Sequence, residues 1–566
     1  MEKNRILLFF VLSLAILYGS RFLLPTPPKE PPKEVTPAKV ENTQPAETPS
    51  PKPVVPPVQA EVAQATESTE ILDIHGDEAR DIVIADPLYV ATLSNVGGVL
   101  KSFKLKEYKD GEGGPLELVD GRKALELGWP LSISSGSEAR DKQLNNAVFK
   151  AQRDGKKVVF EWAGDGLYSK KQYEFNPETY TFSIGSDLAV KGAVTPHRLS
   201  WRGFGDKEVD STGILCWIGL GSCDETTRHA VVDITPDPKP GEQKAAAKFE
   251  RVQPQPAKEK AAVQGPVIEK TTRRAGMEDQ FFLLMMSLSD PAVFNISRER
   301  VADETEKMAG LISVSAPAQG KISIYAGPKD RAVLEKAEPG LGEVINYGFF
   351  WFLTEPLARA LMWLHGFIGN FGWSIVLLTC AINFSLFPLR IRQQLSMQKL
   401  QKIQPKMRTL QDKFKKLKAG DPRRAEIQAE IMNLYKENGV NPVGGCFPLL
   451  LQFPFLIAFY NVLSSTIQLR RAPWILWIQD LSHRDPYFVM PLLMAASMLI
   501  MQRMTPTSVD PQQARMMMIM PLLMVLMFLA YPSGLMLYWL TSNLIGIGQQ
   551  VFITKFWSPS EGEARA

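Results

Sequence analysis

Five apolar segments in the C-terminal part of the chain place the strongest limit on its fold. Each is close to the roughly 17 to 25 residues that a helix needs to cross a bilayer. In hydrocarbon the backbone polar groups must be hydrogen-bonded within the segment, so these runs predict transmembrane helices. The segments are Trp373–Leu389, Phe447–Thr466, Tyr487–Met504, Met516–Tyr531 and Leu535–Ile553.

The N-terminus predicts a sixth spanning helix. Lys3 and Arg5 precede the apolar run Ile6–Tyr18, and Phe22–Leu24 extends this run. A cleaved signal peptide needs small side chains before its cleavage site, but the run ends in large ones. We therefore expect an uncleaved anchor with a cytoplasmic N-terminus.

The basic residues predict the orientation of the chain. Residues 390–440 carry thirteen Lys or Arg against five Asp or Glu, an excess that is typical of cytoplasmic segments. With six spans, both termini are then cytoplasmic, and the large domain after the first span lies in the periplasm of a Gram-negative cell. The formal net charge of +4 over 566 residues gives no reason to expect nucleic-acid specificity.

Between the first two spans the sequence predicts a linker and a β domain. Residues 25–70 are rich in Pro and Lys with almost no aromatic residues, so they cannot bury enough surface to fold. An interruption at Thr235–Pro266 predicts a long surface loop. The rest of residues 71–340 predicts a mostly antiparallel β sandwich, because apolar and polar residues alternate in Tyr89–Leu93, Val158–Trp162, Tyr173–Phe175 and Tyr180–Ile184.

The four cysteines predict neither a metal site nor a cofactor. Cys216, Cys223, Cys380 and Cys446 lack the spacing of a zinc or iron–sulfur site. Cys216 and Cys223 fall in the expected periplasmic segment. A disulfide between them and two free thiols are equally compatible with the sequence.

A helix is expected just before the second span. Thr354-Glu355-Pro356 has the composition of a helix start, and apolar residues from Leu357 to Ile368 recur on one face. Two interpretations are open: a helix at the membrane surface, or an amphipathic helix packed on the β domain. Trp363 and the aromatic residues of Phe349–Leu353 favour the membrane surface.

A helical hairpin is expected between the second and third spans. Ala419-Gly420-Asp421-Pro422 combines a C-terminal glycine with an N-cap and a proline at the first helical position, and Pro405 can kink the first helix. The apolar seam of this hairpin is Leu400, Ile403, Met407, Leu410, Phe414 and Leu417, facing Ile427, Ile431 and Leu434. Its basic surface suits both a solvated positive-inside face and a docking role, and comprises Lys399, Lys402, Lys406, Lys413, Lys416, Arg423 and Arg424.

Neutral polar residues share faces within the expected spans. Such residues can hydrogen-bond between helices, and for any single one this is the better interpretation. Together they can instead line a polar cavity that shortens the path of a polar segment through hydrocarbon. The residues are Thr379 with Asn383, Gln452 with Tyr460, and Tyr538 with Ser542 and Gln549.

Two other functions compete with this interpretation of the polar residues. A polytopic transporter usually carries charged ligands or broken helices near mid-membrane, and these spans are largely neutral. A membrane-anchored periplasmic sugar-binding protein or enzyme would need a catalytic pair. His75, His197 and His229 are its only histidine candidates, and no paired motif surrounds them.

A specific series of motifs resembles the YidC/Oxa family of membrane protein insertases. The first is Asn441-Pro442-Val443-Gly444-Gly445-Cys446-Phe447-Pro448, which leads into Gln452 and Pro454. The family order continues with Arg470-Arg471-Ala472-Pro473, Trp477-Ile478-Gln479-Asp480-Leu481, Asp485-Pro486-Tyr487, Pro532-Ser533-Gly534-Leu535 and Ser542-Asn543-Leu544. The resemblance is strong over Tyr347–Ile553 and is weaker in the β domain.

The resemblance implies a five-helix insertase core with a groove open to the cytoplasm and the lipid, and a periplasmic β supersandwich. It also implies a membrane insertase and chaperone rather than an enzyme, with no cofactor. Its expected partners are nascent membrane proteins, the Sec translocon with its accessory complex, the ribosome and signal recognition particle pathway, and the bilayer. The implied substrate groove contains Thr379, Asn383, Gln452, Tyr460, Tyr538, Trp539 and Ser542.

At two positions the sequence departs from the family pattern. Many members carry an arginine in the groove where alignment through Thr379 and Pro388 places Asn383. An asparagine can hydrate a groove and hydrogen-bond a substrate, but it cannot attract an acidic one. Trp539 stands where a tyrosine is frequent.

These expectations divide the chain into thirteen parts. They are an N-terminal span (1–24), the linker (25–70), the β domain (71–340), an interfacial helix (341–370), the second span (371–390), the cytoplasmic hairpin (391–440), the third span (441–467), a periplasmic loop (468–486), the fourth span (487–504), a cytoplasmic loop (505–515), the fifth span (516–532), the sixth span (533–553) and a cytoplasmic tail (554–566).

Overall fold

The computed structural model describes residues 73–110, 113–119, 121–204, 229–236, 247–254, 266–302, 308–417, 421–439, 447–504, 524, 528–529 and 531–556. They belong to two compact units: the hairpin of residues 389–447, and a unit that holds the β domain with the other helices. The expectations for the first span, the linker, Cys216 with Cys223, Asn441–Cys446 and most of the fifth span lie outside the described residues.

A four-stranded antiparallel sheet opens the β domain. A Cβ on Gly97, whose φ is 71°, would lie 2.4 Å from the carbonyl oxygen of Asn145. The turn between the second and third strands therefore needs glycine for its backbone angle and for its close approach to α3 (Glu138–Asn146). The strands are β1 (Asp81–Ala85), β2 (Tyr89–Ser94), β3 (Val99–Lys109) and β4 (Pro115–Glu117).

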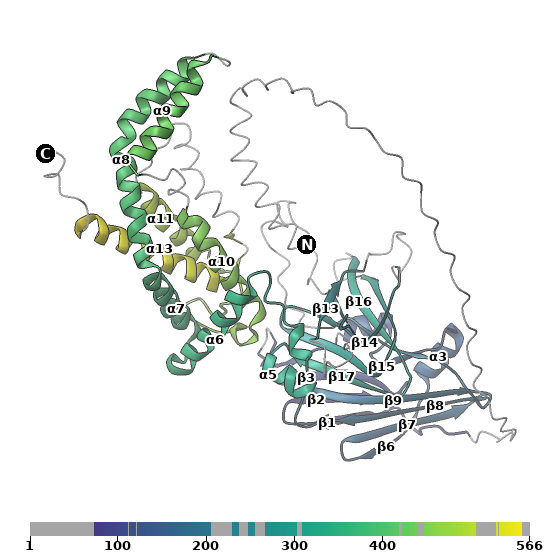
Figure 1. Cartoon of the computed structure of the whole chain (residues 1–566). Coiled ribbons are helices and arrows are strands. Elements are labelled where there is room, and N and C mark those ends of the chain that lie inside the picture. The colour runs from purple at the N-terminus through teal and green to yellow at the C-terminus, as the bar shows by residue number, and fades with distance from the viewer. Residues whose placement is uncertain are drawn as a thin grey trace, which may run out of the picture. The chain divides into compact units, whose positions relative to one another are not determined.

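A sheet of thirteen strands makes up the rest of the domain, and Figure 1 shows β6 to β9 side by side at one edge. Its main path is β13-β12-β14-β15-β17-β9-β8-β7-β6. These strands are β6 (Lys150–Asp154), β7 (Lys157–Gly164), β8 (Leu167–Phe175), β9 (Thr181–Val190), β12 (His229–Asp233), β13 (Phe249–Val252), β14 (Ile268–Glu278), β15 (Phe282–Ala302) and β17 (Lys321–Pro328). The others are β5 (Ser132–Ser134), β10 (Ala193–Val194), β11 (Arg198–Arg202) and β16 (Met308–Pro317).

The long strand β15 belongs to two branches of this sheet. Its first half pairs with β17, and its second half pairs with β16, which continues to β11 and β5. The β14–β15 ladder shifts register between Thr272 and Arg274, and such a bulge bends a strand. Apolar residues of both sheets share one core, in which the rings of Tyr89 and Phe103 stack at 4.7 Å. The expected β sandwich is confirmed.

All four alternating stretches named from the sequence lie in strands β2, β7, β8 and β9, except that Tyr180 precedes β9 by one residue. The loop expected at Thr235–Pro266 is wrong in part, because it contains β13. Phe249–Val252 pairs with β12, and the guanidinium of Arg274 lies 5.1 Å from the centre of the Phe249 ring. This strand has only four residues within a Pro- and Lys-rich stretch, so the composition of its surroundings concealed it.

Lys171 on β8 is fully buried and ties two loops to the sheet. Its Nζ donates hydrogen bonds to the carbonyl oxygens of Gly97 and Leu131, both at 2.8 Å, and of Gly98 at 3.3 Å. Burial lowers the pKa of Lys171 to about 7. The three carbonyls take the place of water around the amino group.

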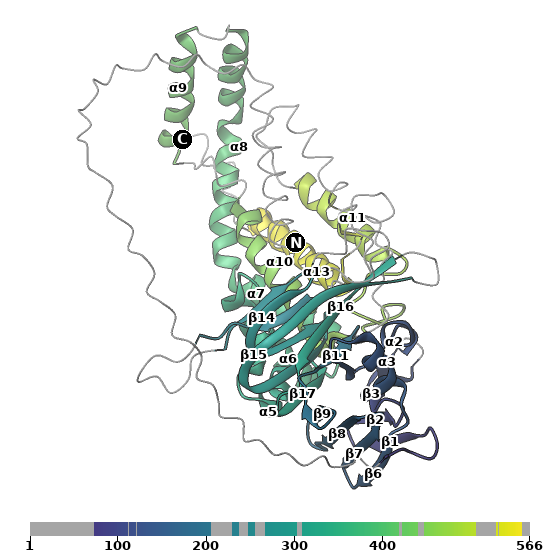
Figure 2. The ribbon, with the colours of Figure 1, turned by 90° about the vertical axis from the view of Figure 1, so that its right-hand side faces the viewer.

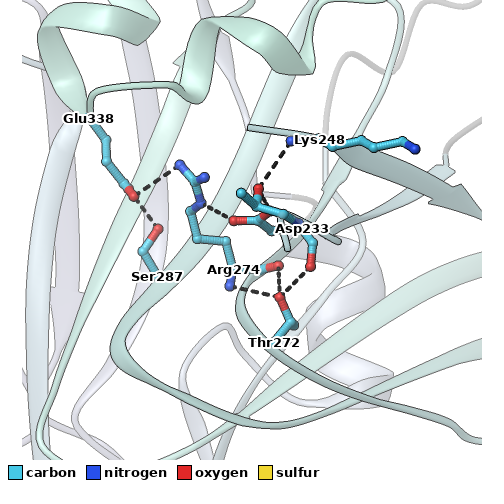
Figure 3. A network of polar contacts seen from close by, with 7 residues as sticks. Asp233, Lys248, Thr272, Arg274, Ser287 and Glu338 are labelled. Atoms are coloured by element: carbon cyan, nitrogen blue, oxygen red, sulfur yellow. Dashed lines mark hydrogen bonds and ion pairs between the residues drawn. The ribbon is translucent and has the colours of Figure 1, made fainter. Parts of the chain in front are cut away.

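Two networks of buried charges link the C-terminal strands to α5 (Arg331–Ala337) and the 3-10 turn η1 (Leu341–Val344). In the first, Arg274 donates to Asp233 at 2.7 Å and to Glu338 at 3.3 Å (Figure 3). Ser287 also donates to Glu338, at 2.7 Å. The strands are thereby held to the residue that ends α5.

In the second network, Glu278 is 3% exposed and accepts hydrogen bonds from Arg251 Nε at 2.5 Å and from Lys329 Nζ at 3.1 Å. Arg251 also donates to the carbonyl oxygen of Val344 in η1, at 2.8 Å. Burial alone would raise the pKa of Glu278, but Lys329 and Arg251 lower it below its ordinary value.

The remaining helices follow the β domain. Among the described helices, none is both long and apolar enough to qualify alone as a membrane span, whereas α7 together with Phe387–Ser396 qualifies as a bent pair. The other short helices are α2 (Gly121–Leu127) and the 3-10 turn η3 (Ile467–Leu469). The long ones are α6 (Trp351–Ile368), α7 (Phe371–Ser385), α8 (Phe387–Lys416), α9 (Arg423–Glu437), α10 (Phe447–Ser465), α11 (Val489–Met504) and α13 (Ser533–Phe556).

The structure corrects the expected start of α6. The helix begins at Trp351, and Pro356 lies inside it. The carbonyl oxygen of Phe350 accepts bonds from Thr354 N at 2.9 Å and Thr354 Oγ1 at 3.0 Å, so this threonine lies within the first turns rather than before them. Leu357 and Leu361 are buried in the helical core rather than in the core of the β domain.

The expected hairpin is confirmed as α8 and α9, which lie side by side in Figure 2. Ile403 and Met407 are buried against Ile431 and Leu434, as the apolar repeat predicts. The helix α8 continues through Pro405. The guanidinium of Arg424 lies 4.5 Å from the centre of the Phe414 ring.

We expect Glu278→Gln to destabilise the β domain by about 3 kcal/mol at pH 7, because the change leaves buried cations without their counter-ion. The lowered pKa means that Glu278 stabilises the fold above its unfolded pKa and loses this effect as the pH falls through the folded pKa. The difference between the wild type and the variant should therefore shrink in acid. Amide hydrogen exchange of β14 in the full chain measures both quantities.

Glu250→Gln is the matched control, since Glu250 forms an exposed ion pair with Lys270 at 3.3 Å. It should cost less than about 1 kcal/mol. Equal effects of the two changes would show that the buried network does not stabilise the domain.

Candidate functional site

Three helices bring together most of the polar residues that the sequence singles out. Asn383 on α7 accepts a hydrogen bond from Ser542 Oγ on α13 at 3.2 Å. Gln452 Nε2 on α10 donates to the same Ser542 Oγ at 3.4 Å. Two turns further along α13, Gln549 Nε2 donates to the carbonyl oxygen of Asn383 at 3.2 Å. We call Asn383, Gln452, Ser542 and Gln549 the polar seam.

Residue types on α7 explain how the seam is positioned. Thr379 Oγ1 donates to the carbonyl oxygen of Ile375 at 2.7 Å, and Asn383 Nδ2 donates to that of Thr379 at 2.8 Å. Both side chains thus satisfy their donors within their own helix, four residues back. The Oδ1 atom of Asn383 is left to face α13.

Aromatic packing surrounds the seam on α10 and α13. Tyr538 stacks on Phe459 with ring centres 4.2 Å apart, and Trp539 lies edge-on to Phe528 at 4.8 Å. Tyr460 faces Tyr531, with ring centres 5.6 Å apart. The three ring contacts fix these predicted groove residues in the helical core.

In this structure the polar seam is closed. Thr379, Asn383 and Ser542 are each no more than 3% exposed, and Tyr538 and Trp539 are also buried. Gln452 and Tyr460 are half-buried. The predicted groove residues therefore lie between packed helices, where a second helix can reach them only if α7 and α13 separate.

A second polar contact holds the other side of α13, and the sequence analysis missed it. Asn543 Nδ2 donates to Ser497 Oγ on α11 at 3.0 Å, and Gln550 Nε2 donates to the carbonyl oxygen of Met504 at 2.6 Å. Seven residues separate Ser542 from Gln549 and likewise Asn543 from Gln550, and this spacing repeats a helix face. The paired repeat is the signal that could have identified it.

The connector between α10 and α11 fixes the N-terminal end of α13. Ser533 N donates to the carbonyl oxygen of His483 at 2.7 Å, and Gly534 N donates to that of Leu481 at 2.9 Å. A Cβ on Gly534 would lie 2.9 Å from Leu463 Cδ2, so glycine allows α13 to approach α10 here. The Pro-Ser-Gly motif thus begins a helix that is clamped on two sides.

The basic residues of the hairpin lie in its own compact unit. Five lysines on α8 are exposed, and gaps of three, four and seven residues place them on one side of the helix. These are Lys399, Lys402, Lys406, Lys413 and Lys416. Arg423 is exposed and pairs with Asp421 at 2.8 Å, whereas Arg424 is half-buried against Phe414.

The described residues contain no group of three or more His, Cys, Asp or Glu that could hold a metal ion. His197 is buried and shares a hydrogen bond with Ser186 Oγ at 2.8 Å. His229 contacts Gln253 at 2.8 Å, and His75 lies 4.0 Å from Asp73. The three histidines considered for an enzyme are thus in three separate surroundings.

Two protein families match the chain by sequence. The family described as 60Kd inner membrane protein matches residues 363–560, and the family described as YidC periplasmic domain matches residues 81–200 and 244–360. Together these matches include the helical core and most of the β domain.

Several proteins named membrane protein insertase YidC are similar to this chain, two of them over nearly their whole length. The membrane protein insertase YidC of Geotalea daltonii is 30% identical, over 98% of this chain and 99% of that protein. The one from Syntrophus aciditrophicus is 31% identical, over 98% and 100%. That of Wolinella succinogenes is 49% identical over 42% of this chain and 43% of its own length. The chain therefore belongs to the YidC family of membrane protein insertases, inner-membrane proteins with a periplasmic β domain.

Proposed function

We propose that this chain inserts nascent membrane proteins into the inner membrane and that their hydrophobic segments enter along the polar seam between α7, α10 and α13. The observation that carries the proposal is the row of neutral hydrogen-bonding side chains between helices that are otherwise apolar. A polar group in hydrocarbon costs several kcal/mol when it has no partner. The seam offers such partners to a substrate backbone or side chain.

The hydrogen bonds of the seam are weak enough for a substrate to replace them. Its three contacts measure between 3.2 and 3.4 Å, at the long end of hydrogen bonds. Hydrogen bonds between membrane helices contribute about 0.6 kcal/mol each on average. Opening the seam therefore costs only about 2 kcal/mol in hydrogen bonds, and the substrate can replace them.

The side of α13 that faces α11 is suited to stay in place while the seam opens. Asn543 and Gln550 hold α13 to α11 through contacts of 3.0 and 2.6 Å, both shorter than those of the seam. The connector clamp at Ser533 and Gly534 adds two backbone bonds. We infer that α13 stays with α11 while α7 moves away from it.

The proposal also includes the membrane topology of the chain. The spans, with both termini in the cytoplasm, follow from the apolar segments and from the excess of basic residues in 390–440. The hairpin would then face the cytoplasm, where its lysines suit the ribosome, the signal recognition particle pathway or the Sec translocon. Substrates would enter either alone or beside that translocon.

Insertion by the purified chain in liposomes tests the main proposal. A short single-span protein should become protease-protected faster than in empty liposomes, without added nucleotide, because the energy comes from burial of its apolar segment. If a folded and correctly oriented chain gives no acceleration, autonomous insertion is excluded. Adding the Sec translocon then separates a dependent insertase from a chain with another function.

Two serine variants test whether the seam itself is used. Ser542→Ala should lower the insertion rate about two- to threefold, because the substrate loses a partner worth a fraction of a kcal/mol. Ser497→Ala is the matched control, since Ser497 is equally buried but lies on the α11 side. Equal rates for both variants would count against entry along the seam.

Asn383 can be tested in the same assay. We expect Asn383→Ala to impair insertion only mildly, because the carbonyl that binds Gln549 remains. Asn383→Arg should be tolerated, as the family resemblance implies, provided that α7 and α13 separate to give the longer side chain room. Complete loss of insertion with the alanine variant would show the asparagine to be indispensable.

Charge reversal tests the docking role of the hairpin. We expect the triple variant Lys399→Glu, Lys402→Glu and Lys413→Glu to weaken binding to translating ribosomes roughly tenfold at low salt, and less at high salt, where charges are screened. Arg408→Glu is the control, because Arg408 is exposed on another side of α8. Binding that is unchanged in the triple variant would leave only the positive-inside role for these lysines. Co-sedimentation with ribosomes provides the measurement.

A further inference from the structure

The connector between α10 and α11 carries large apolar side chains that the described part of the chain leaves exposed. Leu476 is 75% exposed and Tyr487 is 67% exposed, while Ile475 and Phe488 beside them are 38% and 36% exposed. We call these four residues the apolar tip. The two halves of the tip lie close together, because the rings of Trp477 and Tyr487 are 6.4 Å apart.

The apolar tip is held in place by hydrogen bonds. Asp485 is 2% exposed and accepts bonds from Trp477 Nε1 and Tyr487 N, each at 3.0 Å, and from Met490 N at 2.7 Å. Gln479 Nε2 donates to the carbonyl oxygen of Leu476 at 2.7 Å. A connector fixed in this way presents its apolar side chains outward instead of folding them inward.

The backbone of the tip is also strained. Leu476 and Phe488 have φ values of 52° and 56°, in the left-handed region that bulky residues rarely adopt. In water this strain would be combined with exposure of large apolar groups, and no contact among the described residues compensates for either. The conformation therefore needs a contact that the described residues do not provide.

The neighbouring helices indicate what makes this contact. On α7 the exposed residues Trp373, Leu377 and Phe384 share one face, as their spacing of four and seven residues requires. The ring of Trp373 packs against that of Trp474 in the connector, with ring centres 5.8 Å apart. On α11 the exposed residues Leu492 and Leu499 form a similar stripe directly after the tip. In an inner-membrane protein such stripes face lipid, and the tip continues both of them.

The first residues of the connector are mostly polar and are bonded to the β domain. Arg470 Nη1 donates to the carbonyl oxygen of Lys109 at 2.9 Å, and Arg471 Nη1 donates to that of Asp110. Gln468 donates to Asp330, and Ile467 is buried in the core of the β domain. The connector is thus bonded to the β domain through its first residues, whereas its apolar tip is left exposed by the described residues.

We propose that the apolar tip enters the periplasmic leaflet of the bilayer, at the depth of the headgroups and upper acyl chains. Tyr487, with its amphipathic ring, suits this level. The proposal revises residues 468–486 from a loop in the periplasm to a connector that is anchored in lipid on one side and in the β domain on the other. It is independent of the path that a substrate takes.

Fluorescence of single-cysteine variants of the full-length chain tests the proposal. Leu476→Cys, with the four native cysteines replaced by serine, is labelled with an environment-sensitive dye and reconstituted in vesicles of phosphatidylethanolamine and phosphatidylglycerol. We expect blue-shifted emission and a large loss of intensity with lipids that carry a nitroxide near the headgroup. Quenching by a nitroxide at the bilayer centre should be weaker. Tyr487→Cys repeats the test at a second position.

Leu125→Cys is the matched control, because Leu125 on α2 is 76% exposed in the β domain, as Leu476 is in the tip. It should show water-like emission without quenching by lipid. Water-like emission at both tip positions would overturn the proposal. Blue-shifted emission without quenching would overturn it too, because it would show that protein, rather than lipid, covers the tip.

Discussion

The helical core depends on how α13 satisfies its polar side chains on two sides at once. Ser542 and Gln549 bond to α7 and α10, and Asn543 and Gln550 bond to α11. In hydrocarbon none of these groups can bond to water instead, so each contact also fixes a helix. The contacts toward α11 are the shorter ones, and those toward α7 are the longer ones. This asymmetry supports the proposal of a fixed half, made of α13 and α11, and a half that opens with α7.

The connector between α10 and α11 extends the fixed half to the β domain. Its backbone accepts the first amide groups of α13, its Ile467 is buried in the β core, and its arginines bond to the end of β3 and the turn after it. The β domain is itself closed at this end by the ion networks around Arg274 and Glu278. A continuous series of contacts therefore runs from the sandwich to the start of α13.

Sequence patterns predicted those elements in which the periodic repeat of apolar residues is uninterrupted. Alternation placed β2, β7, β8 and β9, and the heptad-like repeat placed the hairpin, because in each case one face is buried and the other is solvated. The four residues of β13 and the early start of α6 were missed because neighbours with a different composition dominate any sequence window. The helical spacing of neutral polar residues singled out Asn383, Gln452, Ser542 and Gln549 as candidates.

Several features depend on contacts between distant parts of the chain and cannot be predicted from local sequence patterns. Lys171 lies in an alternating strand as an ordinary polar residue, yet it is fully buried because three carbonyls from distant loops meet its amino group. The closed state of the seam depends on how the helices pack, which the positions of polar residues along each helix do not determine. The seven-residue repeat marks Asn543 and Gln550 as one face of α13, but their partners on α11 follow only from the packing of the two helices.

Locking α7 to α13 is the most direct test of the central claim that the seam opens to admit a substrate. The double variant Asn383→Cys and Ser542→Cys would be joined by a disulfide or a short bis-thiol reagent in a chain without other cysteines, and insertion would be followed in liposomes. The account predicts that the locked chain loses most of its activity and regains it when the bond is cleaved. Insertion at the same rate before and after cleavage would contradict it, because the substrate would then enter without separation of these two helices.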